Sequence, residues 1–299
     1  MHRCLAVAVG ALLVLSACQS DGAGQDEGAA RHMSSLRWHV DAAWFGGWSG
    51  IEVEGSGAAM TVISDRGRLL TATLRRNAEG HIARVAVTGA AQVPRPNGET
   101  GDWTRPDAEG LAIGAGDTFV SFEGVHRVAR LHGRGAHWLP DPPGRAGLGA
   151  NASFEALAVD GAGRLLTLAE GTIEDEGDLP LHRFESGRWS TPFEIPRRGR
   201  FLPVGADVGP DGLFYLLERD FTGIGFRSRV RRFDLSGSEV RSEETLLQTG
   251  TGVHDNLEGL AVWRDAAGRI RLTMISDDNF RMIVQRTEIV EYVLPDVAR

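Results

Sequence analysis

A carboxylate recurs inside short apolar runs of this chain. Glu109 stands in A-E-G-L-A-I, Glu155 in F-E-A-L-A-V and Glu258 in L-E-G-L-A-V, and Ser49 holds the same place in W-S-G-I-E-V. A buried carboxylate is costly unless it is paired or binds a cation. Oxygen ligands without histidine or cysteine suit a hard ion, Ca²⁺ before Mg²⁺. If these segments converge on one axis, they predict a Ca²⁺ site with Ser49, Glu109, Glu155 and Glu258 as ligands.

This prediction has one exception among the repeats and one alternative. A fifth related motif, V-G-A-D-V, which is the fourth in chain order, has Val204 or Gly205 where the acid should be, and its Asp207 has the opposite strand parity. We therefore expect four repeats, rather than five, to hold the ion. The alternative is that the glutamates line a wide, water-filled channel and bind no ion.

A second set of acids ends the strand that follows each motif. Placed at a channel mouth, such carboxylates could act as proton acceptors or as further metal ligands; the alternative is that they face solvent at strand ends. The expected catalytic residues are Asp65, Glu123, Glu170 and Asp277. The same pattern includes Glu218 and Asp278.

Arginine is the only fixed side-chain cation, because the sequence contains no lysine. Its fork matches phosphate and carboxylate oxygens. Arg219, within E-R-D, is the expected anion-binding residue, and Arg127 and Arg66 are further candidates. The absence of lysine excludes a Walker motif and Schiff-base chemistry, and G-x-S-x-G and H-E-x-x-H are also absent. Water activated by a metal or a carboxylate is the chemistry that remains.

The elements that position these residues form a repeat. Each unit is a short apolar strand, a turn such as D-G-A-G-R, and a second strand, and the motif recurs at intervals of 46 to 60 residues. Such a repeat without helices predicts an all-β, single β-propeller of four-stranded blades. The spacing favours five blades, with six as the alternative. Pairing of L-R-W-H-V (36–40) with the edge strand T-E-I-V-E-Y-V-L (287–294) is expected to close the ring.

The N-terminal part has a different character. His2-Arg3, an apolar stretch and L-S-A-C form a secretory signal that resembles a lipobox; ordinary cleavage is the alternative. We expect a signal peptide over 1–17, lipidation of Cys18, a polar tether over 18–35 and the propeller over 36–299. The only other cysteine, Cys4, would leave with the signal. Gln19 favours the outer membrane, facing the periplasm, with lipid as the only membrane contact.

The quoted motifs, together with L-L-E-R-D-F and I-S-D-D-N-F, make the chain resemble the bacterial phytase-like, or "esterase-like activity of phytase", β-propellers. This resemblance spans residues 47–280 and implies ester or phosphoester hydrolysis. More distantly, the placing of Ser49, Glu109, Glu155 and Glu258 is similar to that of calcium-activated nucleotidases. In that family five blades surround an axial Ca²⁺, and Val204 departs from the pattern.

Two functions of different class follow. The first is a metal-dependent hydrolase of a small anionic or ester substrate. The second is a non-catalytic propeller with a structural ion that binds a ligand or a protein. A gluconolactonase-type lactonase is a third possibility and predicts six blades. The formal net charge of −8 argues against nucleic acid as a partner. The oligomeric state is not encoded in any of these patterns.

Overall fold

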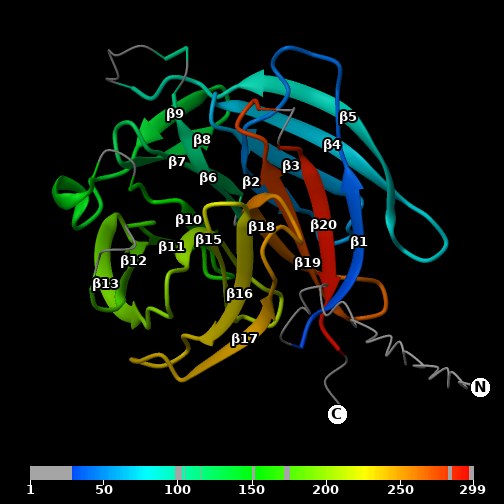
Figure 1. Ribbon diagram of the computed structural model, residues 1–299. Coiled ribbons are helices and arrows are strands. Elements are labelled where there is room, and N and C mark those ends of the chain that lie inside the picture. The colour runs from blue at the N-terminus through cyan, green and yellow to red at the C-terminus, as the bar shows by residue number, and fades with distance from the viewer. Residues whose placement is uncertain are drawn as a thin grey trace, which may run out of the picture.

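The computed structural model describes residues 29–97, 103–104, 106–114, 116–149, 152–171, 176–281 and 285–295. Within these residues the chain forms five antiparallel four-stranded sheets, arranged around a central axis as the blades of a propeller (Figure 1). The predicted all-β fold with five blades is confirmed. The six-bladed alternative is wrong. The lactonase hypothesis predicts six blades, so the observed number of blades speaks against it.

The first four blades follow chain order from the axis outward. Blade one contains β2 (Trp48–Val53), β3 (Ala59–Ser64), β4 (Arg68–Arg76) and β5 (Ile82–Gln92). Blade two contains β6 (Ala108–Gly114), β7 (Asp117–Phe122), β8 (Arg127–His132) and β9 (Gly135–Trp138). Blade three contains β10 (Ala156–Val159), β11 (Leu165–Leu168), β12 (Leu179–Glu185) and β13 (Arg188–Ile195). Blade four contains β14 (Leu202–Val208), β15 (Phe214–Phe221), β16 (Phe226–Asp234) and β17 (Ser242–Gln248).

Blade five joins the two ends of the described chain. Its strands are β18 (Asn256–Arg264), β19 (Ile270–Asp277), β20 (Glu288–Val293) and, outermost, β1 (Arg31–Arg37). The predicted pairing of N- and C-terminal segments is confirmed, with Leu36 opposite Ile289. Two details differ from expectation. β1 begins at Arg31, within the segment expected to be tether, and β1 rather than β20 is the edge strand.

The hydrophobic core is divided among the spaces between blades. Five clusters of buried side chains each join two neighbouring blades. Between blades four and five, for example, Tyr215 and Leu217 pack with Leu260 and Met274. Besides the strands, the described residues include one short 3₁₀ helix, η1 (Arg145–Gly147), and no helix long and apolar enough to cross a membrane.

Four of the five innermost strands have a bulge at the motif position, and in blade three Glu155 directly precedes β10. Register shifts fall at Ser49, Val204 and Glu258, and across Glu109–Gly110. A bulge re-aims its extra side chain, here toward the axis. The glycine of each E-G-L-A-type motif lies against the next blade: a Cβ on Gly205 would stand 2.3 Å from the carbonyl oxygen of Glu258. The motif thus combines a side chain directed toward the axis with a glycine that lets the backbones of two neighbouring blades approach closely.

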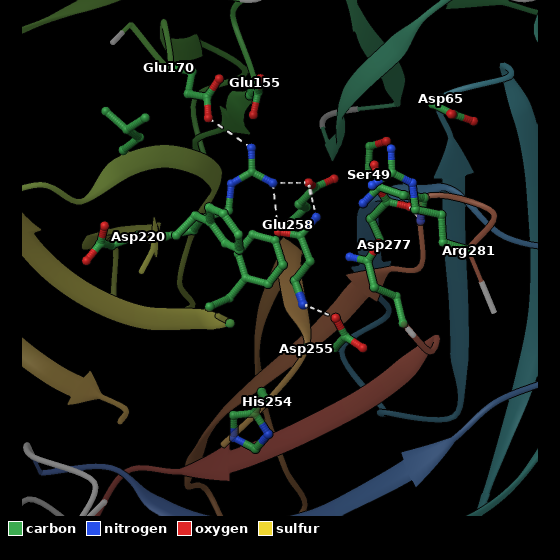
Figure 2. A pocket seen from close by; sticks show the side chains of 18 of the residues that line it. Ser49, Asp65, Glu155, Glu170, Asp220, His254, Asp255, Glu258, Asp277 and Arg281 are labelled. Atoms are coloured by element: carbon green, nitrogen blue, oxygen red, sulfur yellow. Dashed lines mark hydrogen bonds and ion pairs between the residues drawn. The ribbon is translucent and has the colours of Figure 1, made fainter. Parts of the chain in front are cut away.

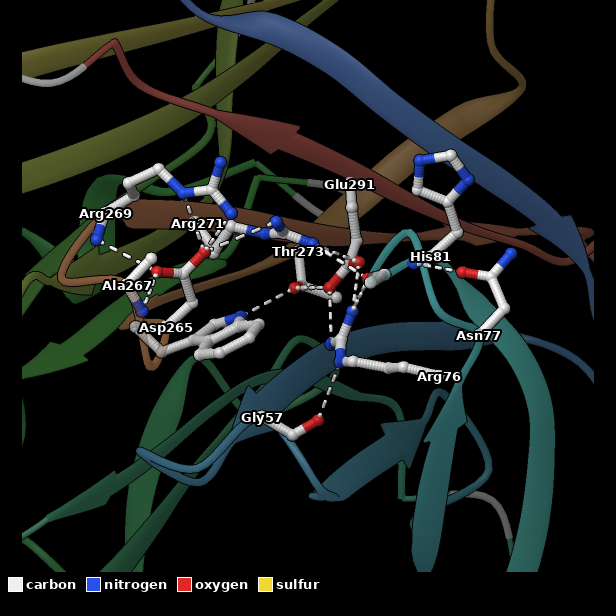
Figure 3. A network of polar contacts seen from close by, with 12 residues as sticks. Gly57, Arg76, Asn77, His81, Asp265, Ala267, Arg269, Arg271, Thr273 and Glu291 are labelled. Carbon is white, nitrogen blue, oxygen red and sulfur yellow. Dashed lines mark hydrogen bonds and ion pairs between the residues drawn. The ribbon is translucent and has the colours of Figure 1, made fainter.

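A buried ion network joins blade one to blade five beside the ring closure (Figure 3). Glu291 of β20 accepts two hydrogen bonds from Arg76 of β4, at 2.5 and 2.8 Å. It also accepts from Thr273 at 2.9 Å and from Arg271 at 3.2 Å. Arg76 lies over the ring of Trp263 of β18. Because Glu291 is fully buried, this network satisfies its charge and ties the first blade to the last.

Candidate functional site

A cavity of about 1040 Å³ opens at one end of the propeller axis. Its wall consists largely of charged side chains from the inner strands and from the ends of the second strands (Figure 2). The carboxylates that line it are Asp65, Asp107, Glu109, Glu123, Glu155, Glu170, Asp220, Asp255, Glu258 and Asp277. The lining arginines are Arg200, Arg219, Arg281 and Arg286. The acids therefore outnumber the arginines, so the cavity favours positively charged or hydrogen-bond-donating ligands.

The first ring around this cavity is formed by residues at the motif position of the inner strands. Ser49, Glu109, Glu155 and Glu258 all line the cavity, as the repeat pattern predicted. Val204 instead packs in the core between blades four and five. Below this ring the axis narrows to a cavity of about 10 Å³, lined mainly by the motif glycines and their neighbours. That space holds no more than about one water molecule, so the channel is not wide at this level.

The second ring is formed by the residues that end the second strand of each blade. The backbone N–H groups of Asp65, Glu123 and Glu170 each donate at 2.8 Å to a carbonyl oxygen two residues before the motif position. Asp277 holds this position in blade five, opposite Asn256. In blade four the residue opposite Leu202 is Arg219. The second ring therefore consists of four acids and one arginine, all of which line the cavity.

Arg219 places a positive charge among the acids of both rings. It donates to Glu170 Oε1 at 2.9 Å, to Asn256 Oδ1 at 2.7 Å and, through a short contact, to Glu258 Oε1. Burial lowers the pKa of Arg219, but the charges of Glu258, Glu170 and Glu155 outweigh burial and raise it overall. The guanidinium thus joins blades three, four and five. Figure 2 shows Glu170, Glu155 and Glu258 gathered on one side of the cavity and Asp65 on the other.

Blade two supplies a group of acids with no such partner. One carboxylate oxygen each of Asp107, Glu109 and Glu123 lie within 4.8 Å of one another, and all three side chains are half-buried. Within the described ranges no ion pair or side-chain hydrogen bond reaches these carboxylates, although the charge of Arg219 partly lowers the pKa of Glu123. Asp107 also has a left-handed backbone, with φ of 58°, which is uncommon outside glycine and asparagine. We call Asp107, Glu109 and Glu123 the blade-two triad.

The pKa values of these acids are raised because the carboxylates are buried close to one another. Burial, followed by the charges of Glu258 and Glu123, raises the pKa of Glu109 well above its ordinary value. Burial and Asp107 raise the pKa of Glu123 to about 7. Burial also raises the pKa of Asp65 to about 6, and its Oδ1 is a buried atom without a hydrogen-bond partner. Each shift expresses the cost of a desolvated charge, which a cation would remove.

The predicted metal ligands therefore differ in their surroundings. Glu258 is bound by Arg219, and Glu155 lies close enough to feel the charge of that arginine. Glu109 belongs to the blade-two triad, which includes Asp107, a residue that the repeat pattern did not single out. The sequence held a signal for it: Asp107 lies two residues before the bulge acid, as Asn256 does in blade five.

Several other predicted residues lie away from the cavity. Arg66 lies over the ring of Phe280, and Arg127 pairs with Asp141 at 2.9 Å. Glu218 is fully buried between Arg229 and Arg231 within blade four. Asp278 accepts a hydrogen bond from the backbone of Gly47. None of these four lines the cavity, so the roles expected for Arg66 and Arg127 lack support. Cys18 and the signal segment lie outside the described residues.

Asp207 has a position of its own, further along the inner strands. It accepts the N–H of Val262 in blade five at 2.6 Å, and Glu52 accepts the N–H of Ile113 in blade two at 3.0 Å. The two acids occupy equivalent places in β14 and β2, three residues beyond the bulge and toward the opposite face. Burial, followed by the charge of Asp207, raises the pKa of Glu52 well above its usual value. Each acid thus links its blade to the next.

Comparisons with solved structures give only weak likenesses. A hydrazine synthase from Kuenenia stuttgartiensis is 13% identical, with a TM-score of 0.42, 81% of this chain covered and 61% of that chain. A chain of a nidogen/laminin complex is 10% identical, with a TM-score of 0.46 and coverage of 76% and 74%. A PQQ-bound aldose sugar dehydrogenase from Streptomyces coelicolor is 13% identical, with a TM-score of 0.45 and coverage of 87% and 98%.

No curated protein matches the sequence. The sequence does match a family over residues 43–280, the range that carries all five motif strands and both rings of the site. The family is described as "Phytase-like: Esterase-like activity of phytase". With its repeated motif acids, its five blades and this match over most of its length, the chain belongs to the phytase-like family.

Proposed function

We propose that this protein hydrolyses carboxylic or phosphate esters with a divalent cation, Ca²⁺, held by the blade-two triad. The observation that carries the proposal is the close approach of the Asp107, Glu109 and Glu123 carboxylates, with which no arginine in the described part of the chain forms an ion pair. Arg219 compensates Glu170 and Glu258 on the other side of the cavity. The acids that remain uncompensated therefore mark where a bound cation would be most favourable.

The donor set fits a hard ion. All three side chains offer carboxylate oxygens, which suit Ca²⁺ and Mg²⁺ and do not select softer metals. Mg²⁺ usually binds through one or two carboxylates and keeps several waters, whereas Ca²⁺ accepts more protein oxygens in less regular geometry. A triad of acids therefore favours Ca²⁺. Bound there, the ion would supply Lewis-acid polarisation of the ester oxygen.

The chain's own residues have separable roles in this proposal. Asp65 is the best proton acceptor, because one carboxylate oxygen has no partner and its pKa of about 6 keeps it ionised yet basic near neutral pH. Arg219 donates to Glu170 and Glu258 and fixes their positions. Glu170, expected from the sequence as a catalytic acid or base, is in this arrangement a positioning residue.

The test begins with metal binding. Calorimetric titration of the chelator-treated protein with Ca²⁺ should show binding to the wild type and a loss of at least tenfold in affinity for Glu109→Gln and Asp107→Asn. Glu79→Gln, an exposed acid on the turn between β4 and β5, is the control and should bind normally. Hydrolysis of p-nitrophenyl acetate and p-nitrophenyl phosphate should then require Ca²⁺. Equal Ca²⁺ affinity in all four proteins would contradict the triad as the site.

The engagement of Arg219 favours a second candidate function. Both of its terminal nitrogens already donate to protein oxygens, which leaves the predicted anion-binding residue occupied. A propeller with a structural ion that binds a ligand without catalysis would have this property. Ca²⁺-dependent melting together with no turnover of either ester would select this reading over hydrolysis.

A further inference from the structure

The hairpin between β15 and β16 carries apolar side chains to the edge of the acidic cavity. Phe221, Ile224 and Phe226 line the same cavity as the carboxylates. The side chain of Ile224 is 93% exposed and that of Phe221 is 54% exposed, the largest values among the exposed large hydrophobic residues of the described chain. Three large apolar side chains together at the rim of a ligand-sized cavity form a patch of the kind that marks a binding site.

The tip of this hairpin is held in one conformation. Phe221 and Phe226 form the last register pair of the two strands, and their rings lie 5.1 Å apart. Both the N–H and the hydroxyl of Thr222 donate to the carbonyl oxygen of Gly225 at 2.9 Å, which closes the turn that presents Ile224. These contacts fix the conformation of the turn, so its apolar side chains form an ordered surface.

The base of the hairpin is anchored by ions. Asp220 is almost fully buried and is bound by Arg227, with Arg200 at 3.5 Å. Strand β15 therefore carries a charged anchor and an exposed aromatic at adjacent positions. Because alternate residues of a strand point to opposite faces, Asp220 faces its ion partners while Phe221 faces the rim.

A continuous wall leads from the rim to the centre of the site. The guanidinium of Arg219 lies 6.0 Å from the centre of the Phe226 ring, and Phe226 in turn contacts Phe221. The polar floor and the apolar rim are thus two ends of one surface. A ligand that follows this wall would have a polar group among the acids and an apolar group against Phe221 and Ile224.

From this arrangement we infer that the ligand of the cavity is amphipathic: an ester or related molecule whose polar end enters the acidic floor and whose alkyl or aryl group packs on the Phe221–Ile224 tip. This inference deepens the proposed function and relies on it only for the ester bond. The apolar subsite itself needs neither metal nor catalysis.

Alkyl glucosides test the subsite without metal, because their hydroxyl groups can donate to the carboxylates. Binding of hexyl, heptyl and octyl glucoside, below their micelle concentrations, is measured calorimetrically in chelator. For the wild type we expect affinity to rise about two- to fourfold per added methylene, the range for partly to fully buried methylenes. The double variant Phe221→Ser/Ile224→Ser should lose this dependence. Val87→Ser, which changes a 41%-exposed valine on outer strand β5, should retain it.

Three outcomes would overturn the inference. The first is that the wild type binds all three glucosides with the same affinity, whatever the length of the alkyl chain. The second is that the double variant shows the same increase in affinity with alkyl length as the wild type. The third is that sedimentation shows a dimeric wild type and a monomeric double variant. The last would make the tip a contact between copies of the chain. Loss of Ca²⁺ binding or of ester hydrolysis, with the glucoside dependence intact, would count against the proposed function alone.

Discussion

Replacing Arg219 by methionine should be among the most damaging single changes near the cavity. The substitution keeps most of the side-chain volume but removes the charge that Glu170 and Glu258 share. The side chain of Arg219 is 20% exposed and those of Glu170 and Glu258 are each 10% exposed, so water cannot replace the lost partner. Removing one member of a buried ion pair typically costs about 3–5 kcal/mol. We expect a loss in this range in the free energy of unfolding at pH 7.5, measured by urea denaturation.

The loss should depend on pH in a defined direction. Burial raises the pKa of Glu258 even beside Arg219, which acts in the opposite direction, so removing the arginine should raise that pKa further. An acid with a raised pKa in the folded state favours folding below its unfolded pKa, and this advantage is lost as pH rises through the folded value. The destabilisation by Arg219→Met should therefore be smaller at pH 5.5 than at pH 7.5.

A control and a refutation follow from the same physics. Arg127→Met removes an arginine whose partner Asp141 is half-exposed, so its cost should be about 1 kcal/mol or less. A similar small loss for Arg219→Met, or a loss that is equal at both pH values, would refute the view that this guanidinium compensates buried acids.

Three further predictions concern stability. In chelator, the free energy of unfolding should be greater at pH 5 than at pH 8, because the pKa values of Asp65 and Glu123 are raised to about 6 and about 7 and the acids must ionise across this window; a flat profile would contradict the raised values. Glu291→Gln should cost about 3–5 kcal/mol, since it leaves buried arginines without their carboxylate at the ring closure; an unchanged melting temperature would show that the network contributes little. Gly205→Ala should cost about 1–3 kcal/mol through its clash with the neighbouring strand, whereas Gly161→Ala, with no atom within 4 Å of the added carbon, should be neutral in the same urea assay.

The repeat was enough to predict the architecture. Motif spacing gave the blade number, and the inward placing of Ser49, Glu109, Glu155 and Glu258 followed from one repeated position. Both are local properties of a short pattern, read from residue type and interval. The pairing of the chain ends was also predictable, because an alternating strand left over at each end needs a partner.

The site within blade four was harder to predict. Its second-strand ending, E-R-D, offers Glu218 and Arg219 with opposite strand parity, and the choice between them depends on the bulge at Val204. A bulge shifts which residues face inward, and no residue type marks it unambiguously. The sequence patterns predict both residues at the cavity, whereas the structure places only Arg219 there and buries Glu218 between Arg229 and Arg231.

The blade-two triad was missed for a different reason. The repeat pattern assigns Glu109 and Glu123 to separate rings and separate roles. Their meeting with Asp107 depends on a left-handed residue before the inner strand, which brings a third carboxylate to the same place. Convergence of this kind arises from tertiary geometry and from a backbone conformation that aspartate adopts only occasionally.

The makeup of blade five also constrains the order of events during synthesis. Of the described strands, β1 is made first and its partner β20 is made last. Until then the final blade has an unpaired inner ribbon, and the ring cannot close on itself. Closure of the ring must therefore await β20, and its slowest step is expected to be the formation of these β1–β20 contacts of very high sequence separation.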